Sequence, residues 1–170
     1  MNENKIEKST FTYPLLFRII FRYGNIIITF LLIVYSIPLA ANLDKNKILI
    51  VPLLISLLII YFLNRHYFNL YKILPYKIEA DDDKMVCSEF FLSRKEIIIN
   101  YNDIASLSGG VFENRISGVM VVCDGKNNVC FGFYHRLKNS NKLATIILSK
   151  VKRELYDEVL ENLISKGKKN

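Results

Sequence analysis

The sequence predicts an α+β membrane protein, in which a two-helix transmembrane hairpin precedes an antiparallel β domain that is closed by a C-terminal amphipathic helix. Three patterns indicate this fold class. Two long uncharged apolar runs occupy most of residues 23–64, short runs rich in β-branched and aromatic residues follow residue 75, and apolar residues recur at helical spacing after residue 140.

The two apolar runs are long enough to cross a membrane. Residues 23–43 carry no charge over 21 residues, and residues 48–64 carry none over 17. At a rise of about 1.5 Å per residue they cover about 31 and 26 Å, against a hydrocarbon core of about 30 Å. A buried hairpin of a soluble protein is less favoured, because neither run has a polar face. The side chains expected at the membrane interface are Tyr23, Tyr61, Phe62, Arg65, Tyr67 and Phe68.

The connection between the runs, residues 44–47, is too short to hold a domain, so we expect an extracytoplasmic turn of a hairpin. Basic residues flank the hairpin on its other side: Lys5, Lys8, Arg18, Arg22, Arg65, Lys72 and Lys77. Because positive residues favour the cytoplasmic side, we predict a multi-pass protein of the cell membrane with both termini in the cytoplasm. A signal peptide cleaved after Ala41 is the rival interpretation, but Leu39 then occupies a position that requires a small side chain.

Residues 1–22 are predicted to be a cytoplasmic segment. A helix that begins at Pro14 places Arg18 and Arg22 on one face, where they could contact lipid phosphates in the interface plane. The same residues could instead extend the first transmembrane helix, and the pattern leaves both interpretations open.

The basic charge belongs mainly to the part of the chain that flanks the membrane. Residues 1–75 hold eight Lys and Arg against three acids, whereas residues 76–170 hold fifteen against thirteen. A basic chain can indicate nucleic-acid binding, but anionic lipid headgroups explain this distribution, so nucleic acid is not a favoured partner.

Beyond residue 75, runs of five to eight residues bounded by Asp, Asn, Gly and Ser predict antiparallel strands. The clearest hairpin is "VVCDGKNNVCF", in which Asp124 and Gly125 supply the turn. A symmetric even-length turn places Cys123 opposite Cys130. In a reducing cytoplasm we expect two half-buried thiols there, and a redox pair is the less favoured alternative.

A helix is predicted at about residues 140–166, either continuous or broken in two. Asn139 or Ser140 can cap its start and Gly167 can end it, before a basic tail at residues 167–170. Its apolar residues recur at helical spacing: Leu143, Ile146, Ile147, Val151, Leu155, Val159 and Leu163.

This order of elements, with the stretches "EIIINYNDIASLSGG" and "GVMVVCDGKNNVCFGF", resembles small bacterial membrane proteins in which a two-helix hairpin is followed by a bacterial pleckstrin-homology-like (PH-like) domain. The resemblance implies a PH-like sheet or barrel at residues 75–166. It further implies a binding or scaffolding role at the cytoplasmic membrane face, and these families have no catalytic motif to carry over.

The turn at Asp81, Asp82 and Asp83 departs from the basic loop with which eukaryotic PH domains grip phosphoinositides, since three acids repel phosphate. It also lacks the ligand spacing of an EF-hand, so a solvated turn is the favoured interpretation. The candidate lipid or partner contacts are basic residues, which could equally be ordinary surface: Arg18, Arg22, Arg136, Lys138 and Lys142.

No catalytic, cofactor or metal site is predicted. The three cysteines include no CxxC, and His135 need not share a cleft with Cys130 and Asp124. We therefore expect a non-catalytic binding or scaffolding protein whose partners are membrane lipids and an unidentified protein, with homo-oligomers left open. The alternatives are an oligomeric pore-forming or transporter-associated protein and, after it, a membrane-bound enzyme of unknown type.

Overall fold

The computed structural model describes residues 9–115 and 118–167. The first eight residues of the predicted segment 1–22 and the part of the basic tail beyond Gly167 lie outside the described residues. The chain divides into two compact units. We call Leu15–Lys72 the hairpin unit, and we call the described residues on either side of it, up to Pro14 and from Ile73, the sheet unit.

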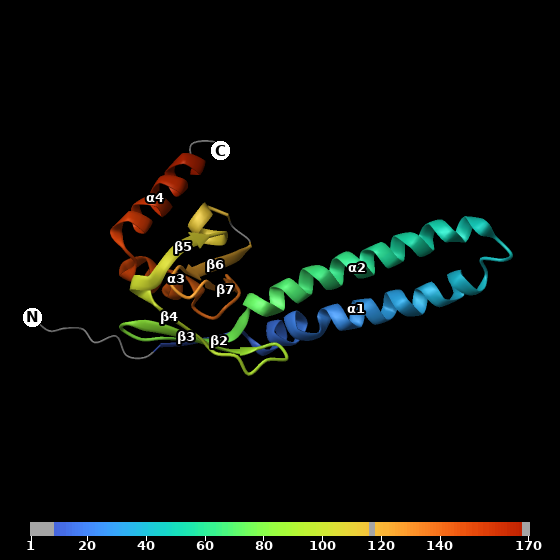
Figure 1. The fold of residues 1–170 in the computed structure, drawn as a ribbon, viewed down its shortest axis with the longest axis horizontal. Coiled ribbons are helices and arrows are strands. Elements are labelled where there is room, and N and C mark those ends of the chain that lie inside the picture. The colour runs from blue at the N-terminus through green and yellow to red at the C-terminus, as the bar shows by residue number, and fades with distance from the viewer. Residues whose placement is uncertain (1–8, 116–117, 168–170) are drawn as a thin grey trace, which may run out of the picture. The chain divides into compact units, whose positions relative to one another are not determined.

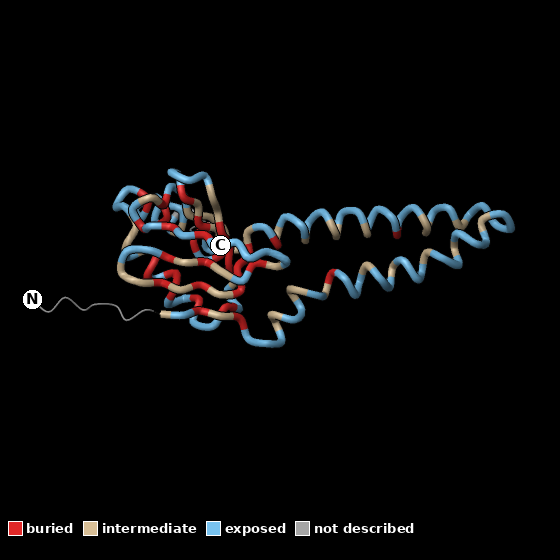
Figure 2. Tube along the Cα trace, turned by 60° about the horizontal axis from the view of Figure 1, so that its bottom comes forward, coloured by how far each residue is buried: buried red, intermediate tan, exposed pale blue. Residues whose placement is uncertain are grey.

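The hairpin unit confirms the predicted pair of long apolar helices. Helix α1 (Leu15–Ala41) and helix α2 (Ile50–Ile73) run antiparallel, and a short turn of 3₁₀ helix, η1 (Lys47–Leu49), leads into α2 (Figure 1). Both are long and apolar enough to cross a membrane, and most of their side chains are exposed (Figure 2). Residues 15–22 are part of α1, continuous with the first apolar run.

Hydrogen bonds between side chains join the two helices at two levels. Near one end, the Asn25 amide donates to Oδ1 of Asn64 at 2.9 Å, and the Asn64 amide donates to Thr29 Oγ1 at 3.1 Å. Nearer the turn, the hydroxyl oxygens of Ser36 and Ser56 lie 2.8 Å apart. Since Asn25 and Ser56 are buried within this unit while its apolar side chains face outward, polar contacts set the register of the two helices.

The sheet unit contains two open antiparallel sheets followed by two helices, so the predicted antiparallel strands are confirmed. The resemblance left open whether the strands form an open sheet or a closed barrel. The described strands form sheets that do not close. The first sheet has the order β1-β2-β3-β4 (Ser9–Thr12, Pro75–Ala80, Lys84–Phe90, Ile97–Asn100). The second has the order β5-β6-β7 (Ile104–Ser108, Val119–Asp124, Val129–Tyr134). Two 3₁₀ helices, η2 (Tyr101–Asp103) and η3 (Gly110–Glu113), flank β5.

Strand β1 lies in a segment for which the sequence did not predict a strand. It precedes α1, yet it pairs with β2, which follows α2, in the register Phe11↔Ile78. A four-residue strand shows too short an alternation to be recognised, and its partner lies more than sixty residues away along the chain. This pairing brings the segments before and after the hairpin into one sheet.

The core of the sheet unit follows the period-two alternation of its strands. A buried row crosses the first sheet through Phe11, Ile78, Cys87 and Ile97, which are paired in register. From the second sheet, Met120, Val122, Phe131 and Phe133 are also buried. Because burial of one large apolar side chain contributes roughly 1.5–3 kcal/mol, these rows supply the main stabilisation of the unit.

The C-terminal segment forms two helices. The sequence left open whether this segment is one continuous helix or is broken in two, and the structure has the broken form. Helix α3 (Ser140–Lys150) buries Leu143 and Ile147, and helix α4 (Arg153–Gly167) buries Leu155 and Val159. Val151 adopts an extended conformation between them. The break lets α4 leave the direction of α3 and pack against η3 and β5.

We predict that Asn64→Leu weakens the hairpin by about 0.5–2 kcal/mol, because it removes the contacts to Asn25 and Thr29 that hydrocarbon cannot replace. The measurement is a titration with detergent in which energy transfer between dyes on the exposed positions Leu31 and Leu58 reports the separation of the helices. The midpoint of this titration is compared between variants. Leu57→Ile, at another exposed position, is the control and should leave the midpoint unchanged. An unaltered midpoint in Asn64→Leu contradicts the prediction.

Candidate functional site

The basic residues predicted as contacts fall into two groups. Arg136 and Lys138 lie in the connection between β7 and α3, Lys142 lies in the first turn of α3, and all three are exposed. Arg18 and Arg22 lie on α1 in the hairpin unit and are half-buried. The first three residues therefore lie exposed around the start of α3 in the sheet unit.

The predicted interface residues all lie on the two long helices. Tyr23 is on α1 and the remainder are on α2, where the Arg65 guanidinium donates to the Tyr61 hydroxyl at 3.0 Å. Tyr61, Phe62, Arg65 and Phe68 are exposed, and Tyr67 is half-buried. An arginine held beside an aromatic hydroxyl is typical of a helix end in the headgroup layer.

Lys150, at the end of α3, holds the acidic turn between β2 and β3. Its ammonium donates to the carbonyl oxygens of Asp81 and Asp82 at 3.2 and 2.6 Å, and to Oδ1 of Asp82 at 3.2 Å. It also lies 5.1 Å from the centre of the Tyr101 ring, close enough for a cation–π interaction. The turn that was expected to be solvated is thus partly neutralised by a lysine that sequence patterns did not single out. We call these contacts the Lys150 clamp.

Two aspartates in the turns of the sheet unit are held in the ionised form. Partial desolvation raises the pKa of Asp81, but hydrogen bonds from the backbone N–H groups of Lys84 and Asp83 outweigh it and hold that pKa below its usual value. Desolvation also raises the pKa of Asp124, but hydrogen bonds from the Asn127 side chain and two backbone N–H groups outweigh it and lower that pKa. Both carboxylates organise turns, which is a structural role.

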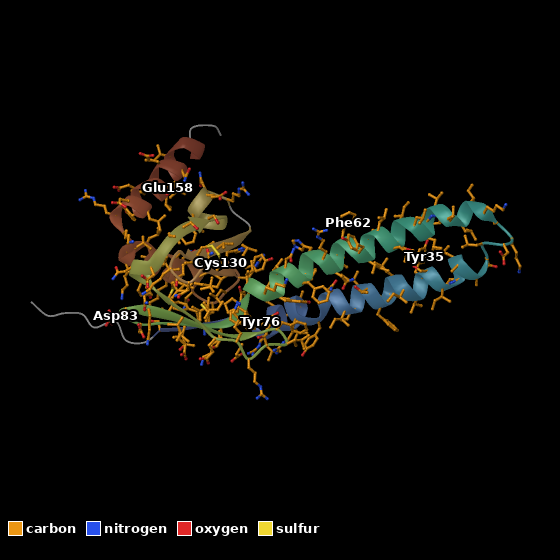
Figure 3. The ribbon with its side chains drawn as sticks, viewed as in Figure 1. Tyr35, Phe62, Tyr76, Asp83, Cys130 and Glu158 are labelled. Atoms are coloured by element: carbon orange, nitrogen blue, oxygen red, sulfur yellow. A yellow bond between two sulfur atoms is a disulfide. The ribbon has the colours of Figure 1, made fainter. Side chains whose placement is uncertain are left out.

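Helix α4 presents an exposed apolar row beside its buried side. Tyr156, Leu160 and Ile164 are spaced four residues apart, with exposed fractions of 38, 37 and 60%. We call this row the α4 stripe. On the side of the stripe away from the buried residues the helix carries exposed acids: Glu154, Asp157, Glu158 and Glu161. Figure 3 labels Glu158 on this helix. Arg153, which lies 3.9 Å from Asp157, and Lys166 are the basic residues of this helix.

A hollow of about 490 Å³ lies beside the α4 stripe, at the break between α3 and α4. Leu148 and Val151 line it together with Tyr156 of the stripe, and Thr145, Ser149 and Arg153 provide its polar edge. Apolar surface that is concave and has a polar edge is typical of a site that takes up another protein segment.

The remaining chemically reactive residues do not assemble into a catalytic arrangement in the described structure. Cys123 and Cys130 face each other across the β6–β7 hairpin, as the turn predicted. The structure shows their oxidised form, a disulfide, in place of the two thiols that were expected, and their direct pairing allows this bond. Asp124 is engaged by the turn and His135 is exposed. Among the described residues, no group of three His, Cys, Asp or Glu side chains could hold a metal ion.

Comparisons of the chain with family models, with characterised proteins and with solved structures found no match. The resemblance to PH-like membrane proteins therefore stays a prediction.

We predict that Lys150→Met lowers the free energy of unfolding of the sheet unit by about 1–3 kcal/mol, because it leaves half-buried acceptors of the β2–β3 turn without their charged donor. Urea unfolding of the full chain in detergent, followed by circular dichroism of the strands, measures the change. Lys152→Met removes an exposed lysine from the connection between α3 and α4 and serves as the control. Equal stability of the two variants contradicts the Lys150 clamp.

Proposed function

We propose that this protein is a membrane-anchored, non-catalytic binding protein that presents its sheet unit at the cytoplasmic face of the cell membrane. The observation that carries the proposal is the α4 stripe, an exposed apolar row between the buried residues of the helix and its exposed acids. A surface of this composition on a domain beside the membrane favours recruitment of another protein.

The anchoring part of the proposal is supported by the outward-facing apolar side chains of the hairpin unit. Such a surface is costly in water and favourable in hydrocarbon. The pairing of β1 with β2 further requires that both ends of the hairpin emerge on the same side of the membrane. The basic residues at those ends favour the cytoplasm as that side.

We assign the sheet unit to the PH-like plan. Two antiparallel sheets of four and three strands, followed by C-terminal helices, are consistent with it. The acidic β2–β3 turn, held by Lys150, does not resemble a phosphoinositide loop, which favours protein over lipid headgroups as the partner of this unit.

We commit to one occupant for the α4 stripe, a protein segment that is basic and amphipathic. Its apolar side chains would cover Tyr156, Leu160 and Ile164 and enter the hollow between α3 and α4. Its lysines or arginines would pair with the surrounding acids, which charge complementarity requires.

We predict that a photo-crosslinking side chain at Leu160 of the full-length protein, in its native membrane, captures one protein reproducibly. Leu92, an exposed apolar residue in the β3–β4 connection with an exposed fraction of 87%, is the matched position and should capture none. Ile164→Glu should lower the capture at Leu160 about tenfold, which corresponds to about 1.4 kcal/mol.

Equal capture from both positions would mean non-specific contact and would count against the proposal. Capture from Lys142 alone would instead make the basic surface of Arg136, Lys138 and Lys142 the recruiting face. Conductance of vesicles that contain the purified protein would favour the oligomeric pore.

The cytoplasmic placement predicts opposite labelling of two exposed positions. In a chain with Cys123→Ser and Cys130→Ser, we expect a membrane-impermeant maleimide to label Asn46→Cys in intact cells. Lys138→Cys should be labelled only after permeabilisation, because it lies on the sheet unit. The reverse pattern would place the sheet unit outside the cytoplasm.

A further inference from the structure

The second sheet carries a pair of cysteines that the proposed function does not use. Cys123 on β6 is directly paired with Cys130 on β7, their Cα atoms lie 4.1 Å apart, and their sulfur atoms are bonded; Figure 3 labels Cys130. On β6 the buried residues Met120 and Val122 alternate with half-buried ones. Cys123 therefore lies on the face of the sheet away from the core.

We propose that Cys123 and Cys130 form a reversible thiol–disulfide site that exchanges with low-molecular-weight disulfides of the cytoplasm. The inference rests on the proposed cytoplasmic placement of the sheet unit. In that compartment the resting pair is a dithiol, since glutathione-type thiols keep cysteines reduced, and the disulfide is its oxidised form.

The exchange is a two-step transfer. The thiolate of one cysteine attacks a sulfur atom of the small disulfide, which forms a mixed disulfide and releases one small thiolate. The thiolate of the second cysteine then attacks the protein sulfur of that mixed disulfide and releases the second small thiolate. The protein dithiol loses two electrons and two protons, and the small disulfide becomes two thiols.

The fold around the site does not depend on the bond, which allows both redox states to keep the hairpin. The adjacent pairs Val122↔Phe131 and Asp124↔Val129 continue the ladder on either side. The Asp124 carboxylate accepts from Lys126 and Asn127 and holds the turn. Seven positions separate the cysteines, so the bond closes a short loop and contributes less by loop closure than a bond across a long loop would.

The third cysteine shows what a purely structural thiol looks like in the same unit. Cys87 lies in the buried row of the first sheet with an exposed fraction of 0%, and burial raises the pKa of its thiol. Such a thiol is rarely ionised and poorly reached, whereas Cys123 and Cys130 are half-buried. Cys87 is therefore an internal reference for the experiment.

The test measures the thiol state of each cysteine in the full-length protein in living cells. Acid quenching is followed by alkylation with one maleimide, reduction, and alkylation with a heavier maleimide, before mass spectrometry of the peptides. We expect Cys123 and Cys130 to be mostly thiols at rest. Brief treatment with 2-hydroxyethyl disulfide should oxidise more than half of both together, and its removal should restore the thiols, with Cys87 unchanged.

Three results would overturn the proposal: a pair already oxidised at rest, a pair that stays reduced during treatment, and oxidation that is not reversed. The labelling of Asn46→Cys and Lys138→Cys tests, independently of the thiol state, on which side of the membrane the sheet unit lies. If the pair is oxidised at rest while that labelling supports the cytoplasm, the reversible site fails and the proposed location stands.

Variants separate the internal bond from other thiol chemistry. In Cys130→Ser, treatment should leave a hydroxyethylthiol adduct on Cys123 in place of the internal disulfide, whereas Cys87→Ala should behave as the unaltered chain. Formation of an internal disulfide lowers the mass of the intact protein by two hydrogens. If this loss is still seen in Cys130→Ser after treatment, the pairing of these two cysteines is overturned.

Discussion

The pairing of β1 with β2 is the constraint on which the rest of the structure depends. The two strands are neighbours in one sheet, yet the whole hairpin unit lies between them in the chain. Backbone hydrogen bonds therefore bring the entry to α1 and the exit from α2 together. Tyr13 extends this closure, since its hydroxyl accepts from the backbone N–H of Tyr134 at 2.9 Å, and Lys138 N–H donates to the Thr12 carbonyl. In the proposed membrane placement, such a closed connection requires an even number of crossings.

The two units are stabilised by opposite means, which suits the solvent that each is proposed to face. In the sheet unit, apolar rows are buried and most charged groups lie outside, so the hydrophobic effect drives folding. In the hairpin unit, apolar side chains are exposed, and Asn25, Thr29, Asn64, Ser36 and Ser56 meet between the helices. Hydrocarbon offers these polar groups no alternative partner, so they specify how the helices associate.

The C-terminal helices connect stability with the proposed function. Helix α3 completes the core and its last residue, Lys150, neutralises the β2–β3 turn, whereas α4 buries only one side. Because the helix is broken at Val151, α4 packs against η3 and β5. Tyr156, Leu160 and Ile164 remain exposed in this arrangement. The proposed thiol–disulfide site lies on the second sheet, to which β5 also belongs, and would add a response to oxidation.

By itself the sequence determined the features that are encoded locally. Uncharged runs of bilayer length predicted α1 and α2, and the Asp124–Gly125 turn predicted the Cys123↔Cys130 register, because hydrophobic length and turn chemistry are properties of contiguous residues. Tertiary structure alone decided that Ser9–Thr12 is a strand, that Asn25 meets Asn64, and that Lys150 holds the acidic turn. Helical spacing predicted the row with Leu155 and Val159 that the core covers, whereas the fold decided that Tyr156, Leu160 and Ile164 beside it stay exposed. These features join residues far apart in the chain, and only the folded arrangement brings such residues within contact distance.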